Sequence, residues 1–167
     1  LGVYLSKRNK VAMIILNVSY LGKIIPSLAI LALAMPLIGV GFAPSLLALS
    51  VLAIPSILIN TTTAFREVDK NVIEAAKGMG MDKYRIMRKV EFPLALPVVI
   101  TGIRTATVEV IAGATLAAFI GGGGLGDYII NGIALANSSM LLVGALPICI
   151  LAFAGDLIFG GIETWVS

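Results

Sequence analysis

A stretch of 42 residues, Ile24 to Phe65, carries no charged side chain. An apolar helix needs ~20 residues to cross the ~30 Å hydrocarbon core of a bilayer, so this stretch is long enough for two crossings. The glycine- and proline-containing segment 39–44 lies near its middle and is typical of a turn. The stretch therefore predicts a hairpin of two membrane spans, at about 24–40 and 44–65.

The rest of the chain has the same character. Hydrophobic residues make up 59% of the 167 residues and charged residues 13%, whereas soluble domains have about 45–50% and about 25%. Two further apolar runs predict spans at about 94–120 and 140–162. We therefore expect one all-α integral membrane domain over 1–167. Because the sequence begins at Leu1 and residues 1–5 resemble the end of an apolar helix, we also expect a first span to precede it.

Lys and Arg predict the orientation of these spans. Segment 66–91 contains seven of them with five Asp or Glu, and four more (Lys7, Arg8, Lys10 and Lys23) precede the first full span. The turn at 39–44 and the loop 121–139 contain none. Since Lys and Arg concentrate on the cytoplasmic side, 66–91 and the carboxyl end should face the cytoplasm and the other two loops the exterior. We interpret 11–22 as an interfacial helix on the inner surface.

Several functions are disfavoured by composition. The chain has no His and a single cysteine, Cys149, so a disulfide within the chain is excluded and we expect no metal site. The net charge of +3 clusters beside membrane spans, so topology explains it better than nucleic-acid binding does.

The charged segment 66–91 has the pattern of a helix, a turn and a second helix. Asp69 is placed to cap a helix over 70–77, and Gly78 and Gly80 then allow a tight reversal. Asp82 is placed to cap the second helix, which carries an apolar stripe (Ile86, Met87 and Val90) and which we expect Pro93 to end. The small side chains of the first helix allow another protein to approach closely. A solvated loop with an amphipathic helix on the membrane explains the pattern equally well.

The same segment resembles the EAA motif of binding-protein-dependent ABC importer permeases. The matching positions are Glu74-Ala75-Ala76, Gly80, Val90 and Phe92-Pro93, where Val90 and Phe92 replace the family's Ile and Leu. The resemblance implies the type I importer (MetI-like) membrane fold and makes 66–91 the coupling loop. It also implies a contact with a cytoplasmic ATPase dimer, which binds the ATP and Mg, so that the chain itself needs no cofactor. The residues expected at that contact are Glu74, Ala75, Ala76, Lys77, Gly78 and Gly80.

Three further segments, 25–29, 102–108 and 117–126, are similar to the osmoprotectant subgroup, whose members import glycine betaine, carnitine or choline. This resemblance implies a cell-membrane permease that works with an extracytoplasmic binding protein, separate or fused, and with a second permease subunit. We expect the second subunit to be identical. A methionine-type permease of the same fold is the alternative. A passive channel or scaffold is a more distant one.

Three charges lie inside expected spans, and each should face protein or a water-filled path. We expect Arg104, Thr105 and Glu109 as candidates for the translocation path, although a structural hydrogen bond explains Glu109 equally well. Arg104 and Glu109 are about 140° apart round a helix, so each should find a partner elsewhere. For Asp156 we expect a structural partner. A membrane hydrolase would need Glu109 and Asp156 as an acid pair, which their wide separation in sequence disfavours.

The glycine run after the third span is the last candidate site. It comprises Gly121, Gly122, Gly123, Gly124 and Gly126. A dinucleotide site is excluded because no strand precedes the run and no acidic residue follows at ~20 positions. An outer gate or binding-protein contact and a simple turn remain open. Aromatic residues are scarce in the spans, which disfavours an aromatic cage and predicts that selectivity lies mainly in the binding protein.

Overall fold

The computed structural model describes residues 9–166, with side chains from Leu16 onward. Within that range the chain is helical and contains no strand. The helices are α2 (Asn9–Ile24), α3 (Ser27–Ile38), α4 (Phe42–Glu67), α5 (Lys70–Gly78), α6 (Lys83–Ile86), the π-helical turn η1 (Met87–Glu91), α7 (Phe92–Ala117), the 3-10 turn η2 (Ala118–Ile120), α8 (Leu125–Ala134) and α9 (Ser138–Val166). The expected end of an earlier span at 1–5 lies outside the described residues.

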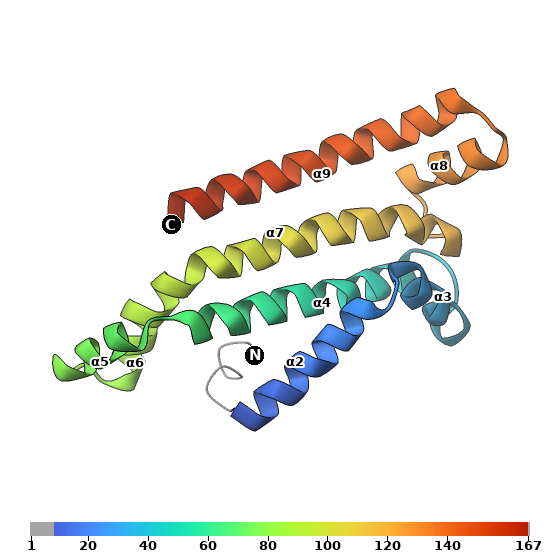
Figure 1. Cartoon of the computed structure of the whole chain (residues 1–167). Coiled ribbons are helices and arrows are strands. Elements are labelled where there is room, and N and C mark those ends of the chain that lie inside the picture. The colour runs from blue at the N-terminus through green and yellow to red at the C-terminus, as the bar shows by residue number, and fades with distance from the viewer. Residues whose placement is uncertain (1–8, 167) are drawn as a thin grey trace.

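Three long helical segments run side by side along the molecule (Figure 1). They are α4, the continuous run from α6 through η2, and α9, and each is long and apolar enough to cross a bilayer. The 26 residues of α4, for example, extend ~39 Å at ~1.5 Å per residue. These helices contain the segments 44–65, 94–120 and 140–162 that the sequence predicts as spans.

The first predicted span is wrong in its bounds. Instead of one helix over 24–40, α2 ends at Ile24, α3 begins at Ser27, and the two are bent by 94°. Pro26 causes the break, because it has no N–H to donate and disfavours helical geometry at Ile25. α2 contacts α4 and α3 lies at the far end of the bundle (Figure 1). Residues 11–22 thus belong to the bundle, and α2 with α3 supplies a fourth span only as a broken one.

Small residues let α4 and α7 pack closely along their length. Ser56 and Thr62 on α4 are fully buried, and Ala106 on α7 is 3% exposed. At Gly102 an added Cβ would lie 2.6 Å from Cβ of Asn60. Large apolar side chains instead point outward over most of the bundle, which is the arrangement expected of helices that associate within lipid.

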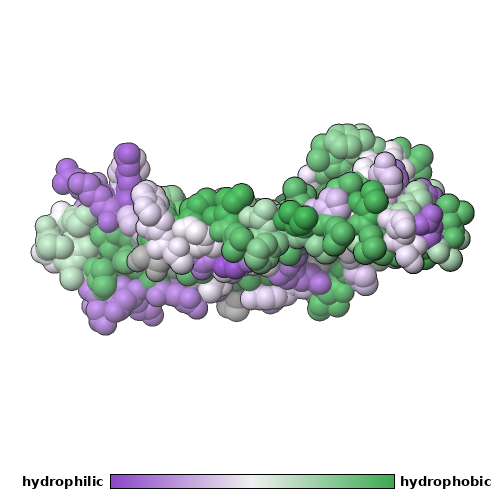
Figure 2. All heavy atoms as spheres, turned by 90° about the horizontal axis from the view of Figure 1, so that it is seen from above, coloured by the Kyte–Doolittle hydropathy of each residue, from purple (hydrophilic) through white to green (hydrophobic). Residues whose placement is uncertain are grey.

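The two ends of the bundle differ in charge. The turn at 39–41 meets η2, where the Gly41 N–H donates to the Ile120 carbonyl at 2.7 Å. The charged α5–α6 segment lies at the opposite end (Figure 1), and Figure 2 shows hydrophilic side chains gathered there. This arrangement agrees with the predicted orientation, in which the two loops without Lys or Arg share one side of the membrane.

Candidate coupling surface and translocation cavity

The α5–α6 segment is a helix-turn-helix held by local hydrogen bonds, as the sequence predicts. The Asp69 carboxylate accepts the Asn71 N–H at 2.8 Å and starts α5. Gly80, at φ +77°, ends it in a left-handed turn whose N–H groups return to the last carbonyls of the helix. The Asp82 carboxylate then accepts the Arg85 N–H at 3.0 Å and starts α6.

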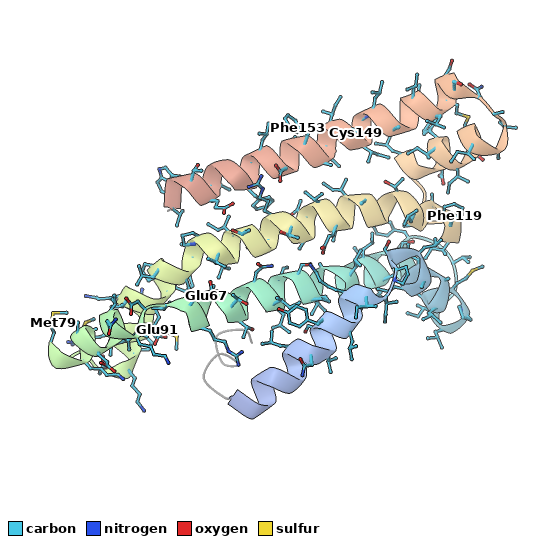
Figure 3. The ribbon with its side chains drawn as sticks, viewed as in Figure 1. Glu67, Met79, Glu91, Phe119, Cys149 and Phe153 are labelled. Carbon is cyan, nitrogen blue, oxygen red and sulfur yellow. The ribbon has the colours of Figure 1, made fainter. Side chains whose placement is uncertain are left out.

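One face of α5 is open and the other is buried. Five of the six candidate contact residues are exposed: Glu74, Ala75, Lys77, Gly78 and Gly80. Met79 is 74% exposed and lies at the tip of the loop (Figure 3). Ala76 is only 1% exposed, so its side chain packs within the chain, and its place in the predicted ATPase contact stays a prediction. Its small size serves packing within the chain, while Ala75 faces outward.

The loop is fixed to the long helices by apolar contacts. Phe65 at the end of α4 and Val68 after it pack with Ala95 on α7, and Ile73 of α5 packs against this cluster. The centroids of the Phe65 and Phe92 rings lie 6.4 Å apart. These contacts join α5 to both long helices.

The second helix of the loop does not stop at Pro93, which corrects the sequence prediction. It continues from α6 through η1 into α7, with the Phe92 N–H bonded to the Met87 carbonyl five residues earlier. The π-helical turn widens the backbone immediately before Pro93. Pro93 lies in the first turn of α7, where its missing N–H is tolerated. Sequence pattern alone does not reveal a turn of this kind.

A cavity of about 420 Å³ lies between the end of α2, the α2–α3 turn, α4 and α7. Glu109 of α7 reaches it and is held by two partners. One carboxylate oxygen accepts the hydroxyl of buried Ser56 on α4, and the other lies 3.1 Å from Nζ of Lys23. The prediction that Lys23 lies with the cytoplasmic charges is wrong, because Lys23 belongs to the last turn of α2 and pairs inside the bundle.

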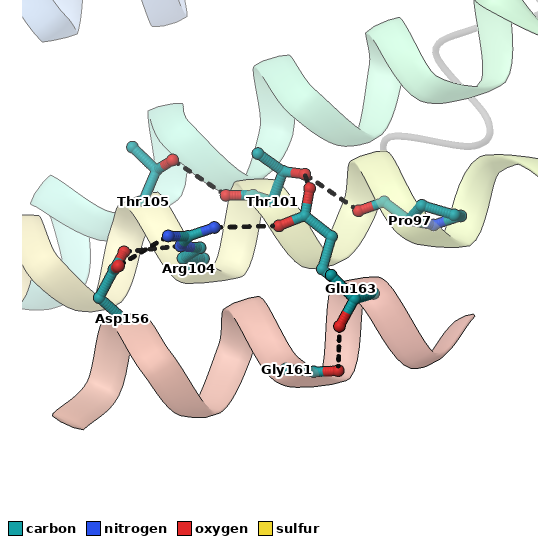
Figure 4. Close-up of polar contacts among 8 residues, drawn as sticks. Pro97, Thr101, Arg104, Thr105, Asp156, Gly161 and Glu163 are labelled. Atoms are coloured by element: carbon teal, nitrogen blue, oxygen red, sulfur yellow. Dashed lines mark hydrogen bonds and ion pairs between the residues drawn. The ribbon is translucent and has the colours of Figure 1, made fainter. Parts of the chain in front are cut away.

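Arg104 and Thr105 do not share this cavity. The Arg104 guanidinium pairs with both carboxylate oxygens of Asp156 at 2.6 Å and with Glu163 at 3.3 Å, both on α9 (Figure 4). The Thr101 hydroxyl donates to Glu163 at 2.7 Å, and Thr105 bonds back to the Thr101 carbonyl. Arg104 therefore joins α7 to α9. Arg104 and Glu109 have separate partners, as the sequence predicts, and a translocation-path role for Arg104, Thr105 and Glu109 stays a prediction. The structural partner predicted for Asp156 is confirmed.

The glycine run forms a defined turn. Gly121 is left-handed at φ +75°, and the N–H groups of Gly121 and Gly122 return to Ala118 and Ala117, which ends η2 in a Schellman motif. Gly126 lies so close to α7 that an added Cβ would be 2.4 Å from the Thr115 carbonyl oxygen. Local backbone geometry and close packing thus explain these glycines, and a gating role for the run stays a prediction.

The described residues contain no cluster of His, Cys, Asp and Glu suited to a metal ion. Glu109 and Asp156 are paired with different cations on different sides of α7. They therefore do not form the acid pair that a membrane hydrolase would need.

Comparison with known proteins settles the family. The profile of the binding-protein-dependent transport system inner membrane components matches residues 1–167. The chain belongs to this family. It is 46% identical over 163 residues to the choline transport system permease protein OpuBB of Bacillus subtilis, covering 98% of the chain and 75% of that protein. It is 44% identical over 162 residues to the carnitine transport permease protein OpuCB of Listeria monocytogenes, covering 97% and 74%.

A solved structure shares the fold. The structure titled "Inward facing conformations of the MetNI methionine ABC transporter" matches with a TM-score of 0.87 at 23% identity, over 99% of the chain and 84% of its counterpart. The chain thus has the all-α type I ABC importer membrane fold that the sequence predicts. It is an integral membrane transport subunit, and its relatives are transport permeases rather than enzymes.

Proposed function

We propose that this chain is the cell-membrane permease subunit of an ATP-driven importer for small quaternary ammonium osmolytes. Its partners are a cytoplasmic ATPase dimer, an extracytoplasmic binding protein or fused domain, and a second permease subunit of the same kind. Relatives named for choline and carnitine transport support the substrate class. The ATPase binds the ATP and Mg, and the permease forms the path through the membrane.

The exposed face of α5 carries this proposal. Glu74, Ala75 and Lys77 are open on a short helix at the charged end of the bundle, and the family resemblance assigns this helix to the ATPase contact. The apolar cluster around Val68 ties the same helix to α4 and α7. A movement of the ATPase surface against α5 therefore reaches both helices, which shifts the spans between outward and inward openings.

Reconstitution tests the proposed function directly. The permease, its ATPase and its binding protein are placed in proteoliposomes, and uptake of radiolabelled glycine betaine is measured with and without ATP. Glu74→Arg reverses the charge on the exposed face of α5, so we expect loss of ATPase co-purification and of ATP-driven uptake. Asn131→Arg, on exposed α8 away from the coupling loop, is the matched control and keeps co-purification.

Two results contradict the proposal. Full coupling of ATP hydrolysis to uptake in the Glu74→Arg variant shows that α5 is not the ATPase contact. Flux that is equal with and without ATP in the wild-type vesicles identifies a passive channel instead.

A further inference from the structure

The Lys23–Glu109 pair is charged and accessible, and it borders a cavity. Their side chains are 37% and 32% exposed, although α2 and α7 are apolar helices of the bundle. A charge within a membrane span is stable only against protein or water. Both residues line the 420 Å³ cavity and are the only charged residues among the described residues that line it, so the open side of the pair faces that space.

The two partners of Glu109 differ in how easily they can leave. Ser56 is 0% exposed and donates to one carboxylate oxygen from the packed face of α4. Lys23 approaches the other oxygen at 3.1 Å from the last turn of α2, immediately before the break at Pro26. Ser56 therefore holds the carboxylate in place, and Lys23 is the exchangeable partner on a long, flexible side chain.

The rest of the lining suits a small ligand held weakly. The described residues that form it are aliphatic, proline, glycine and serine residues, and none of them is aromatic. Its volume is within the ~300–1,000 Å³ of small-molecule sites. Without an aromatic cage a quaternary ammonium is bound loosely, and a site on a transport path must release its ligand as readily as it accepts it.

We propose that this cavity is a zwitterion site on the substrate's route, in which the ligand inserts into the Lys23–Glu109 pair. The ligand's quaternary ammonium replaces Lys23 at the Glu109 carboxylate, and its carboxylate pairs with the released Lys23 ammonium. No charge is left unpaired in the membrane by this exchange. The inference rests on the proposed function and deepens it, because it separates zwitterions such as glycine betaine from choline, which has no carboxylate to offer Lys23.

Substitution of each charge separates the two ligand classes. We measure binding by saturation-transfer difference NMR on the trimethylammonium protons of glycine betaine and choline, with the permease–ATPase complex in nanodiscs without binding protein. Lys23→Met should weaken the binding of glycine betaine by about tenfold or more, which is the effect of losing one hydrogen bond to a charged group. The same variant should bind choline as tightly as wild type or more tightly. Glu109→Gln should weaken the binding of both ligands, and Lys23→Arg should preserve the binding of both.

The double variant Lys23→Met/Glu109→Gln distinguishes a binding site from a structural ion pair. It leaves no unpaired charge, so it should fold even where a single variant does not, and it should bind neither ligand. Wild-type-like glycine betaine binding by the double variant overturns the inference, as does an equal loss of both ligands in Lys23→Met. Absence of a signal from the wild-type complex also overturns it.

Failure of the inference is distinguishable from failure of the proposed function. ATP-driven uptake by the wild-type importer with its binding protein is measured on the same preparation. Uptake without a signal at the cavity contradicts the zwitterion site alone, whereas absence of uptake of any quaternary ammonium contradicts the proposed function.

Discussion

Two glycines on the same helix should respond in opposite ways to alanine. Gly144 lies where α9 meets α8, and an added Cβ would be 2.8 Å from Cγ1 of Ile129 and 2.9 Å from the Leu125 carbonyl oxygen. Gly161 lies further along α9, and an added Cβ would have nothing within 4 Å. Alanine in a helix interior gains ~0.8–1.0 kcal/mol over glycine at both positions. Gly144→Ala also forces α8 and α9 apart, because a backbone oxygen is among the crowded atoms.

Overpacking of this kind costs ~1–3 kcal/mol. Gly144→Ala should therefore lower the free energy of unfolding by ~0–2 kcal/mol, while Gly161→Ala should raise it by ~1 kcal/mol. Unfolding in mixed micelles with increasing dodecyl sulfate, followed by far-UV circular dichroism, measures both variants against wild type. Equal shifts in the two variants would refute the reasoning, because they would show that close contact between α8 and α9 does not constrain Gly144.

Three further predictions concern the coupling loop and the α7–α9 contact. Gly80→Ala should destabilise the loop by ~1–2 kcal/mol because φ is positive there, whereas Gly78→Ala, at an exposed position of α5, should not. Thermal unfolding compares the stability of the two variants. Ala76→Leu should lower thermal stability because the side chain is buried, whereas Ala75→Leu should weaken only ATPase co-purification. Identical outcomes for the two variants would show that the buried and exposed faces of α5 are assigned wrongly. Arg104→Leu should leave its two acidic partners on α9 without a cation and so reduce the yield of folded protein recovered from membranes. Arg104→Lys should restore part of that yield, and a fluorescence size-exclusion assay measures both variants.

Local sequence pattern determined much of the fold and of the coupling surface. Asp69, Gly80 and Asp82 act on backbone groups within a few residues, so their roles follow from spacing alone. The long apolar runs predict helices for an equally local reason, since a chain in lipid must satisfy its own backbone hydrogen bonds. The orientation of the ends follows from Lys and Arg counts, with Lys23 as the exception.

The tertiary structure decided which charges meet and which small residues are open. Lys23 and Glu109 come from helices far apart in sequence, and the packing of α2 on α4 brings them to one cavity. Arg104 is drawn to α9 rather than to Glu109 because two carboxylates face it there. A charge within a span must find some partner, but sequence does not say which, because that choice depends on the rotation and depth of neighbouring helices.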